Sequence, residues 1–277
     1  MEELRFNQER SFKIYEETIR PTSTGRVYRA QDAELNRDVF IKEVNIDPEK
    51  WNEQINSVKT EVKLLVRLSN ETHRVPYILE IFEDRTKSVL IMIMQLIRGQ
   101  TLNEKMEKGG ISRDSFLDYM IQLCDLLILM DRQNLHHKDI KPENIIIDNK
   151  NALYLIDFNI TNSRPNLTEG TVGYMAPEMF IPSLTSIRKY VDQFSVGVML
   201  YEFFTGSCPV YAKDYGNSLR SSSKEWVKYV NAKEKNNSIS DSMDKIIAKC
   251  MMMDPERRYR NNQDLKSALV AEKRGAR

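Results

Sequence analysis

The sequence predicts an α+β fold of two lobes, in which a small, antiparallel, β-rich lobe is followed by a larger and mainly helical lobe. Between residues 19 and 96, short runs with strand-like alternation surround one helical segment. After Gly99 the apolar residues recur at helical spacing instead. The length of 277 residues suits one large domain or two lobes.

The first lobe is expected to hold strands around one long helix. Residues 51–68 carry apolar side chains at the spacing of one helix face, beginning with Ile55 and Val58. A turn is expected at residues 35–37, and a hinge at residues 95–100 ends the lobe. Strands are expected at residues 19–32, 38–44, 77–83 and 88–96.

The second lobe is expected to be built from helices. Residues 113–133 place their apolar side chains on one face, whereas residues 191–204 are apolar nearly all round and should form a buried helix. A further helix is expected over residues 242–252, where Asp254 and Pro255 end it. The chain is therefore divided into an N-lobe at 12–97, a C-lobe at 98–271 and terminal extensions at 1–11 and 272–277.

Composition and charge limit the classes of function. The net charge is +1, which gives no broad field for nucleic acid or a membrane surface. The cysteines are widely spaced and form no CxxC pair, which argues against a disulfide framework or a zinc site and is typical of a reducing compartment. No apolar stretch approaches the ~20 residues of a membrane span, and the acidic N-terminus lacks a signal core. We therefore expect a cytoplasmic protein with no nucleic-acid partner and no membrane segment in this chain.

The most informative feature of the chain is the run HHKDIKPEN at residues 136–144, followed by a second carboxylate at Asp157. The run places a carboxylate (Asp139), a lysine (Lys141) and an amide (Asn144) on one short loop. Phosphoryl transfer from a nucleotide needs such a set: a base for the acceptor hydroxyl, a cation for the moving phosphoryl group and oxygen ligands for Mg²⁺.

This arrangement resembles the catalytic loop and the metal-binding loop of eukaryotic-type protein kinases, whose patterns are H-R-D-x-x-x-x-N and D-F-G. The resemblance covers about residues 12–270 and implies a bilobal protein-kinase-like fold with a helix C in the N-lobe. It also implies ATP with Mg²⁺ or Mn²⁺ and a protein substrate that accepts the γ-phosphate on Ser or Thr. A regulatory protein partner is compatible with it. Asp139 would be the general base, and Lys141 would reach the γ-phosphate as in Ser/Thr kinases. Asn144 and Asp157 would hold the metal.

A second polar pair is expected in the N-lobe. Phe40, Lys42 and Val44 share one face of a strand, because side chains alternate along it. A lone strand lysine is most often solvated. Glu61, however, lies on the apolar stripe of its helix, where a carboxylate is costly without a partner. Lys42 and Glu61 resemble the strand lysine and helix-C glutamate of protein kinases, a pair that positions the lysine on the α- and β-phosphates.

The resemblance also assigns residues around the nucleotide. Of the phosphate-covering pattern G-x-G-x-x-G-x-V, this chain matches only Gly25 and Val27. Met94 would be the gatekeeper, and the Gln95 carbonyl and Ile97 amide would bind the adenine edge. The nucleotide-contacting set implied in this way is Gly25, Val27, Phe40, Lys42, Met94, Gln95, Ile97, Asn144, Ile146 and Asp157.

Other matches to the family are structural. The run TVGYMAPE, which contains Glu178, resembles the end of a kinase activation segment. In the family, this glutamate forms a buried ion pair with a late arginine, which here is Arg258. Asp192 is expected to cap the backbone of the catalytic loop, and His137 is expected to pack under Phe158 and hold the loop.

Several positions depart from the family pattern. Lys138 replaces arginine, Asn159 replaces the glycine after Asp157 and Phe158, and Phe40 replaces alanine. Phe40 could stack edge-on with adenine, or it could fill the site as bulky residues do in some pseudokinases. Two alternatives to an active kinase therefore stay open. One is a pseudokinase that acts as a scaffold or allosteric partner with impaired nucleotide binding, and the other, disfavoured by the activation-segment ending, is a small-molecule kinase.

Overall fold

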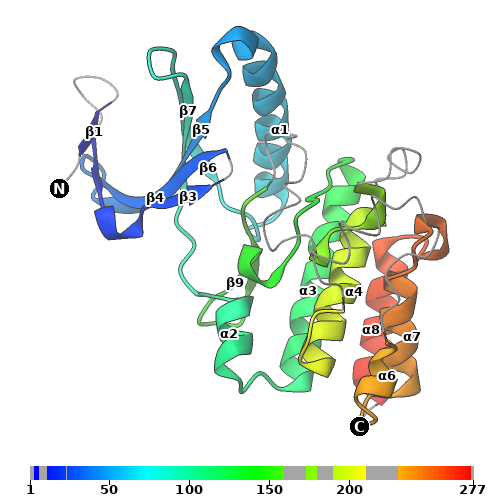
Figure 1. The fold of residues 1–277 in the computed structure, drawn as a ribbon. Coiled ribbons are helices and arrows are strands. Elements are labelled where there is room, and N and C mark those ends of the chain that lie inside the picture. The colour runs from blue at the N-terminus through cyan, green and yellow to red at the C-terminus, as the bar shows by residue number, and fades with distance from the viewer. Residues whose placement is uncertain are drawn as a thin grey trace. The chain divides into compact units, whose positions relative to one another are not determined.

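The structure is a computed structural model that describes residues 3–5, 11–22, 24–158, 173–179, 190–209 and 230–275, with the backbone alone at 3–5 and at Glu61. These residues form two compact units, the first ending at Arg98 and the second beginning at Gly99. The first unit is built around a sheet, and the second is mainly helical (Figure 1).

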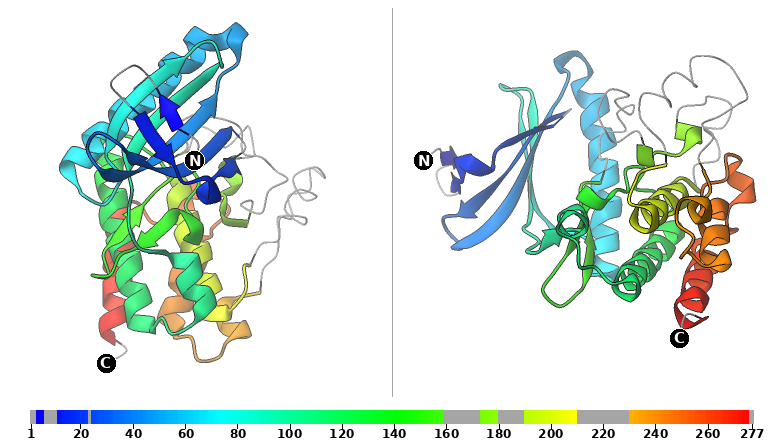
Figure 2. Two further views of the ribbon diagram at one scale, coloured as in Figure 1. Left: turned by 90° about the vertical axis from the view of Figure 1, so that its left-hand side faces the viewer. Right: turned by 60° about the horizontal axis from the view of Figure 1, so that its bottom comes forward.

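The first unit is an antiparallel sheet with the strand order β1-β2-β4-β5-β7-β6, and β3 pairs with β4 beside it. The helix α1 (Trp51–Glu71) lies beside this sheet (Figures 1 and 2). The strands are β1 (Glu3–Arg5), β2 (Ser11–Ile14), β3 (Arg20–Thr22), β4 (Gly25–Asp32), β5 (Arg37–Asn45), β6 (Ile78–Asp84) and β7 (Val89–Gln95).

The strands β5, β6 and β7 lie where the sequence predicts strands, and α1 begins at the predicted residue. One prediction is wrong: residues 19–32 do not form a single strand. They form a hairpin of β3 and β4, in which Thr22 pairs with Gly25. The polar residues 22–24 before Gly25 are a turn signal, and the prediction of a single strand overlooked it. The strands β1 and β2 were not predicted.

Glu43 on β5 is buried on the face of the sheet that carries an apolar cluster. Tyr28 and Ile41 belong to that cluster and pair across β4 and β5. The Glu43 carboxylate accepts hydrogen bonds from the Tyr28 hydroxyl (2.5 Å) and from Nε of Arg26 (2.6 Å). These contacts satisfy a buried charge that would otherwise be costly. Because side chains alternate, Lys42 points to the opposite face of the sheet.

The second unit contains the helices α2 (Leu102–Lys108), α3 (Arg113–Arg132), α4 (Val191–Thr205), α6 (Ala232–Lys235), α7 (Asp241–Cys250) and α8 (Asn262–Gly275). The helix α8 packs along α3, and α7 packs against α4 (Figures 1 and 2). A small antiparallel sheet accompanies them, in the order β10-β9-β8. Its strands are β8 (Gln100–Thr101), β9 (Ile145–Ile147) and β10 (Leu153–Leu155).

The helix α4 forms the core of the second unit. Every residue from Val191 to Tyr201 is buried, which confirms the prediction of a helix that is enclosed on all sides. The helices α3 and α7 also lie where they were predicted, whereas α2 and α8 were not predicted. In α8 the buried side includes Asn262 and Glu272 beside Leu265 and Leu269. Polar residues thus interrupt the apolar periodicity from which a helix is recognised.

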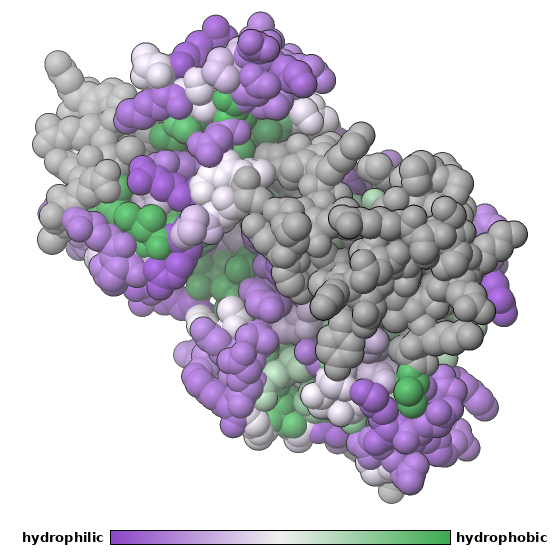
Figure 3. All heavy atoms as spheres, viewed as in Figure 1, coloured by the Kyte–Doolittle hydropathy of each residue, from purple (hydrophilic) through white to green (hydrophobic). Residues whose placement is uncertain are grey.

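The described surface on the face shown in Figure 3 is mostly hydrophilic, and hydrophobic residues appear on it as small patches. Scattered exposed apolar residues of this kind are normal for a folded protein. Among the helices that the structure describes, none combines the length and the apolar character needed to cross a membrane.

Gly197 allows α4 and α7 to approach closely. A Cβ at this position would lie 2.6 Å from the Cβ of Cys250 and 2.8 Å from Cγ of Met251. We expect Gly197→Ala to lower the free energy of unfolding by about 1–2 kcal/mol in chemical denaturation, because the overlap outweighs the gain in helix propensity. Gly275→Ala is the control, since a Cβ there meets nothing within 4 Å. An equal or higher stability of Gly197→Ala would contradict the packing argument.

Candidate functional site

The backbone of the loop at residues 136–144 is bound by the carboxylate of Asp192. Asp192 lies in the first turn of α4 and is 4% exposed. Its Oδ2 accepts a hydrogen bond from the backbone N–H of His137 (3.0 Å), and its Oδ1 accepts one from the N–H of Lys138 (2.9 Å). The predicted capping role of Asp192 is therefore confirmed.

Lys138 has a left-handed backbone, with φ at 67°. A residue with a Cβ pays roughly 1–2 kcal/mol to adopt this conformation. The two charge-assisted hydrogen bonds that Asp192 accepts offset such a cost. The backbone is therefore held in place at Lys138, the residue immediately before Asp139.

His137 is buried and supports the loop from inside. Its Nδ1 accepts a hydrogen bond from the backbone N–H of Asp139 (3.3 Å), and its Nε2 lies 2.9 Å from the carbonyl oxygen of Ile156. Both contacts are made together only when Nε2 carries the proton and donates it. The ring also lies against Phe158, with 4.6 Å between the ring centroids. The predicted packing of His137 on Phe158 is confirmed.

The polar groups of the loop converge on Asp139. The side-chain amide nitrogen of Asn144 donates to the carbonyl oxygen of Asp139 (2.8 Å) and to its Oδ2 (3.0 Å). The ammonium of Lys141 lies 3.3 Å from the same Oδ2. The other carboxylate oxygen, Oδ1, is buried and has no hydrogen-bond partner among the described residues. One oxygen of Asp139 is thus fixed, and the other can still accept a proton or a hydrogen bond.

Asp157 follows β10 and is exposed. Its φ of 58° is left-handed, a conformation that aspartate tolerates better than most residues. The backbone N–H of Ile156 donates to the carbonyl oxygen of Asn144 (2.9 Å), which ties the two predicted metal-binding positions into one local structure. Asn159, the departure from the D-F-G pattern, lies outside the described residues.

A buried ion pair joins Glu178 to Arg258. The guanidinium donates two parallel hydrogen bonds to the carboxylate (2.5 and 2.8 Å), and both side chains are fully buried. Further donors of Arg258 bind the carbonyl oxygens of Tyr190 and Met252, each at 2.9 Å. Because each charge is matched and hydrogen-bonded, burial is tolerated. The predicted pair is confirmed.

The contact between Tyr174 and Glu202 was not predicted. The tyrosine hydroxyl donates to the Glu202 carboxylate (2.5 Å). Burial and this hydrogen bond raise the pKa of Tyr174. Burial also raises the pKa of Glu202, as does the negative charge of Glu143, while the bond from Tyr174 opposes the rise. The signal that could have found it is the lone carboxylate of Glu202 at the end of the apolar run that forms α4.

The first unit carries all but one of the other predicted site residues. Lys42 lies on β5 between Val27 on β4 and Met92 on β7, and it is 9% exposed. The side chain of Glu61 is outside the described residues, so its pairing with Lys42 stays a prediction. Phe40 is half-buried two residues before Lys42 and pairs with Met94.

Gly25 begins β4 at a point where only a glycine fits. A Cβ there would lie 2.1 Å from the carbonyl oxygen of Glu43 on the neighbouring strand. The predicted hinge residues follow at the end of β7, where Met94 is buried and Gln95 and Ile97 are partly exposed. Ile146 lies in the second unit, in the middle of β9.

The chain matches the protein kinase domain family over residues 16–270. The chain belongs to the protein kinase family. The bilobal α+β fold predicted from the sequence is thereby confirmed.

The kinase domain is similar to bacterial and plant serine/threonine kinases. It is 28% identical over 272 residues to a probable serine/threonine-protein kinase of Clostridium acetobutylicum, covering 93% of this chain and 39% of that protein. It is 28% identical over 259 residues to the serine/threonine-protein kinase PrkC of Bacillus subtilis, covering 88% and 38%. A CBL-interacting serine/threonine-protein kinase of Arabidopsis thaliana is 29% identical over 198 residues, covering 68% and 37%. The chain thus spans well under half the length of these relatives.

Breaking the buried ion pair of the kinase domain should be costly. We expect Glu178→Gln to lower the free energy of unfolding by about 3–5 kcal/mol, because it leaves the guanidinium of Arg258 buried without a counter-charge. Asp125→Asn is the matched control. Its carboxylate is 55% exposed and pairs with Lys266, so its loss should change stability by less than about 1 kcal/mol. If urea denaturation showed equal decreases in the free energy of unfolding for Glu178→Gln and Asp125→Asn, burial would not explain the cost of breaking the pair.

Removing the cap on the catalytic loop should expose its backbone to exchange. In Asp192→Ala, the N–H groups of His137 and Lys138 lose their acceptors. We expect the free energy of unfolding to fall by roughly 3 kcal/mol or more. Asp148→Ala is the control, because Asp148 also accepts two backbone N–H bonds (2.8 Å each) but in an exposed turn where water can replace it.

Hydrogen–deuterium exchange measures this difference directly. Exchange at residues 137 and 138 should speed up strongly in Asp192→Ala and stay unchanged in Asp148→Ala. Protection at residues 137 and 138 that persists without Asp192 would mean that other contacts hold the loop.

Proposed function

We propose that this kinase domain transfers the γ-phosphate of ATP to serine or threonine hydroxyls of protein substrates, with Mg²⁺ as the metal. The observation that carries the proposal is the asymmetry of Asp139. Its Oδ2 is held by Asn144 and Lys141, whereas its buried Oδ1 has no partner among the described residues. An acceptor hydroxyl is the group that would complete this arrangement, because it can donate to Oδ1 and pass its proton there.

Lys141 supports this chemistry through its position. Its ammonium shares Oδ2 of Asp139 rather than Oδ1. The free oxygen can therefore receive the acceptor hydroxyl while the ammonium faces the phosphoryl group that the hydroxyl attacks. A fixed cation in a partly enclosed site stabilises the developing charge without reorganisation. Lys141 is 18% exposed, so solvent screens it only in part.

The residues present fit a hard divalent cation. The amide nitrogen of Asn144 is already used toward Asp139, which leaves its Oδ1 as an oxygen ligand. Asp157 offers an exposed carboxylate from a loop tied to the Asn144 backbone. Mg²⁺ prefers a few protein oxygens together with substrate phosphates, and Mn²⁺ accepts the same ligands. When bound, the metal would neutralise charge on the phosphates.

Nucleotide binding is proposed for the residues of the N-lobe. Lys42, paired with Glu61, would hold the α- and β-phosphates, and the hairpin of β3 and β4 at Gly25 and Val27 would cover them. The adenine edge would meet the Gln95 carbonyl and the Ile97 amide. Met94 and Phe40 would supply apolar surroundings of the ring.

The preference for Ser and Thr is supported by Lys141 and by the relatives, which are named as serine/threonine-protein kinases. The acceptor and any regulatory partner would then be proteins. The wide spacing of the three cysteines, with no CxxC pair, supports a cytoplasmic location, where thiols stay reduced.

Phosphate transfer in the Asp139→Asn variant tests the proposal. We expect transfer from γ-labelled ATP to a generic basic protein to fall by about 10²–10⁴-fold, because the amide cannot accept the proton. The wild-type protein and Asp125→Asn, an exposed carboxylate on α3, are the controls. Binding is followed separately by the thermal shift with ATP and Mg²⁺, which should persist in Asp139→Asn.

The two readouts separate the possible failures. ATP at 100 times its dissociation constant should stabilise the folded protein by ~2.7 kcal/mol. No transfer and no ATP-dependent shift in the wild type would favour the pseudokinase, with Phe40 filling the site. A shift without transfer to any protein, together with transfer to a small metabolite, would favour a small-molecule kinase.

A further inference from the structure

The C-lobe contains a cavity of about 940 Å³ that none of the proposed catalytic residues lines. It lies where the start of α3, the end of α4 and the helices α7 and α8 come together. Small-molecule sites in proteins have volumes of roughly 300–1,000 Å³ and mostly apolar walls with a few polar groups. The walls here are formed chiefly by Phe203, Phe204, Met243, Ile246, Ala268 and Ala271.

Two aromatic rings shape one wall of the cavity. Phe203 stacks on Phe116, with 3.8 Å between the centroids and 3° between the planes, so one face of its ring is already covered. Phe204 stands at 88° to Phe203, at a centroid distance of 5.2 Å. The pair forms an aromatic corner, and such a corner favours a flat ring that can stack on one member and meet the other edge-on. Met243 adds a polarisable sulfur beside it.

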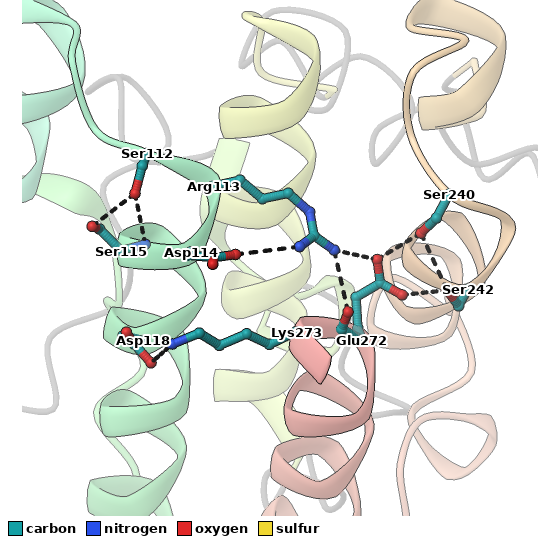
Figure 4. A network of polar contacts seen from close by, with 9 residues as sticks. All are labelled: Ser112, Arg113, Asp114, Ser115, Asp118, Ser240, Ser242, Glu272 and Lys273. Carbon is teal, nitrogen blue, oxygen red and sulfur yellow. Dashed lines mark hydrogen bonds and ion pairs between the residues drawn. The ribbon is translucent and has the colours of Figure 1, made fainter. Parts of the chain in front are cut away.

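Glu272 lies in the polar wall of the cavity and is buried (Figure 4). Its carboxylate accepts hydrogen bonds from Nη2 of Arg113 (2.5 Å), from the Ser240 hydroxyl (2.6 Å) and from the Ser242 hydroxyl. Burial would raise the pKa of Glu272, but these donors outweigh it and lower the pKa. The carboxylate is therefore ionised and fully satisfied, and a cationic ligand would find no free anion there.

The charge left over in the lining is positive. Arg113 directs Nη2 at Glu272, and its Nη1 makes a longer contact of 3.5 Å with Asp114 (Figure 4). Lys245 is an exposed second cation in the lining. The hydrogen bond and the charge of Lys233, and to a smaller extent the charge of Lys245, lower the pKa of Asp241, and the ion pair of Asp241 is with Lys233. Arg113 is balanced by Glu272 and Asp114, whereas Lys245 has no ion pair among the described residues, so the lining favours a ligand that carries one negative charge near Lys245.

We propose that this cavity binds a small aromatic carboxylate, with its ring in the corner of Phe203 and Phe204 and its carboxylate toward Lys245. The assignment is independent of phosphate transfer, because it uses none of the residues of the catalytic loop. It concerns the site and the chemical class of the ligand.

Calorimetric titration with three probes of one ring system tests the charge preference. The probes are 2-naphthoate, the neutral 2-naphthamide and the cationic 2-naphthylmethylammonium. We expect saturable binding of one 2-naphthoate per chain, about tenfold tighter than the amide, and the weakest binding for the cation. Equal affinities for all three, or no saturable binding of 2-naphthoate, would overturn the proposal.

Paired variants locate the binding. Ala271→Phe fills the cavity from α8 and should abolish 2-naphthoate binding, whereas Ser267→Phe, at an exposed position of α8 outside the lining, should not. Lys245→Glu should weaken 2-naphthoate by about tenfold and leave 2-naphthamide unchanged. Arg274→Glu makes the same change of charge at an exposed position outside the lining and should have little effect. Binding that survives Ala271→Phe, in a variant with unchanged thermal stability, would place the ligand elsewhere and refute the site.

Discussion

The catalytic loop depends on the two hydrogen bonds that Asp192 accepts from the backbone at residues 137 and 138. They fix the one point at which the loop has a left-handed residue, Lys138, and so they set the direction in which Asp139 leaves the backbone. A carboxylate suits this position for a second reason. It lies in the first turn of α4, where the helix dipole stabilises negative charge. The buried helix thus provides a rigid support for a strained loop, and its N-terminal end stabilises the carboxylate that makes the contact.

The same helix organises the rest of the C-lobe site. Phe194, two residues after Asp192, lies under the guanidinium of Arg258, at 5.1 Å from the ring centroid. Ser195 donates to the carbonyl oxygen of Tyr174 (2.8 Å), and Glu202 accepts from the hydroxyl of that tyrosine. One helix, buried from Val191 to Tyr201, therefore contacts the catalytic loop, the ion pair and the end of the activation segment. Because its buried part is packed on all sides, the residues that make these contacts cannot move independently of one another.

Features that depend on a short stretch of sequence were predicted, whereas features that depend on contacts between residues far apart in the chain were not. The loop at 136–144 and the buried run that forms α4 are visible as short patterns. The partnership of Tyr174 with Glu202 is not, since each residue is ordinary until the fold brings them together. The helix α8 was not predicted because Asn262 and Glu272 occupy core-facing positions, where the Asn262 amide nitrogen donates to Asp131 and the Glu272 carboxylate accepts from Arg113. The hairpin of β3 and β4 was not predicted because the polar residues 22–24 before Gly25 were not recognised as a turn.

The remaining asymmetry of Asp139 follows from this framework. Among the buried side-chain atoms of the described residues that lack a hydrogen-bond partner, its Oδ1 is the one that belongs to an ionisable group. An unsatisfied buried acceptor costs roughly 1–3 kcal/mol, and more when it is charged. A structure that merely conserved the fold could relieve this cost by rotating the carboxylate or admitting another donor. Here Asn144 and Lys141 both hold Oδ2, and Asp192 fixes the backbone beneath, so the cost persists. We propose that a group kept in this state is prepared for a donor that arrives from outside, as a general base is for its acceptor hydroxyl.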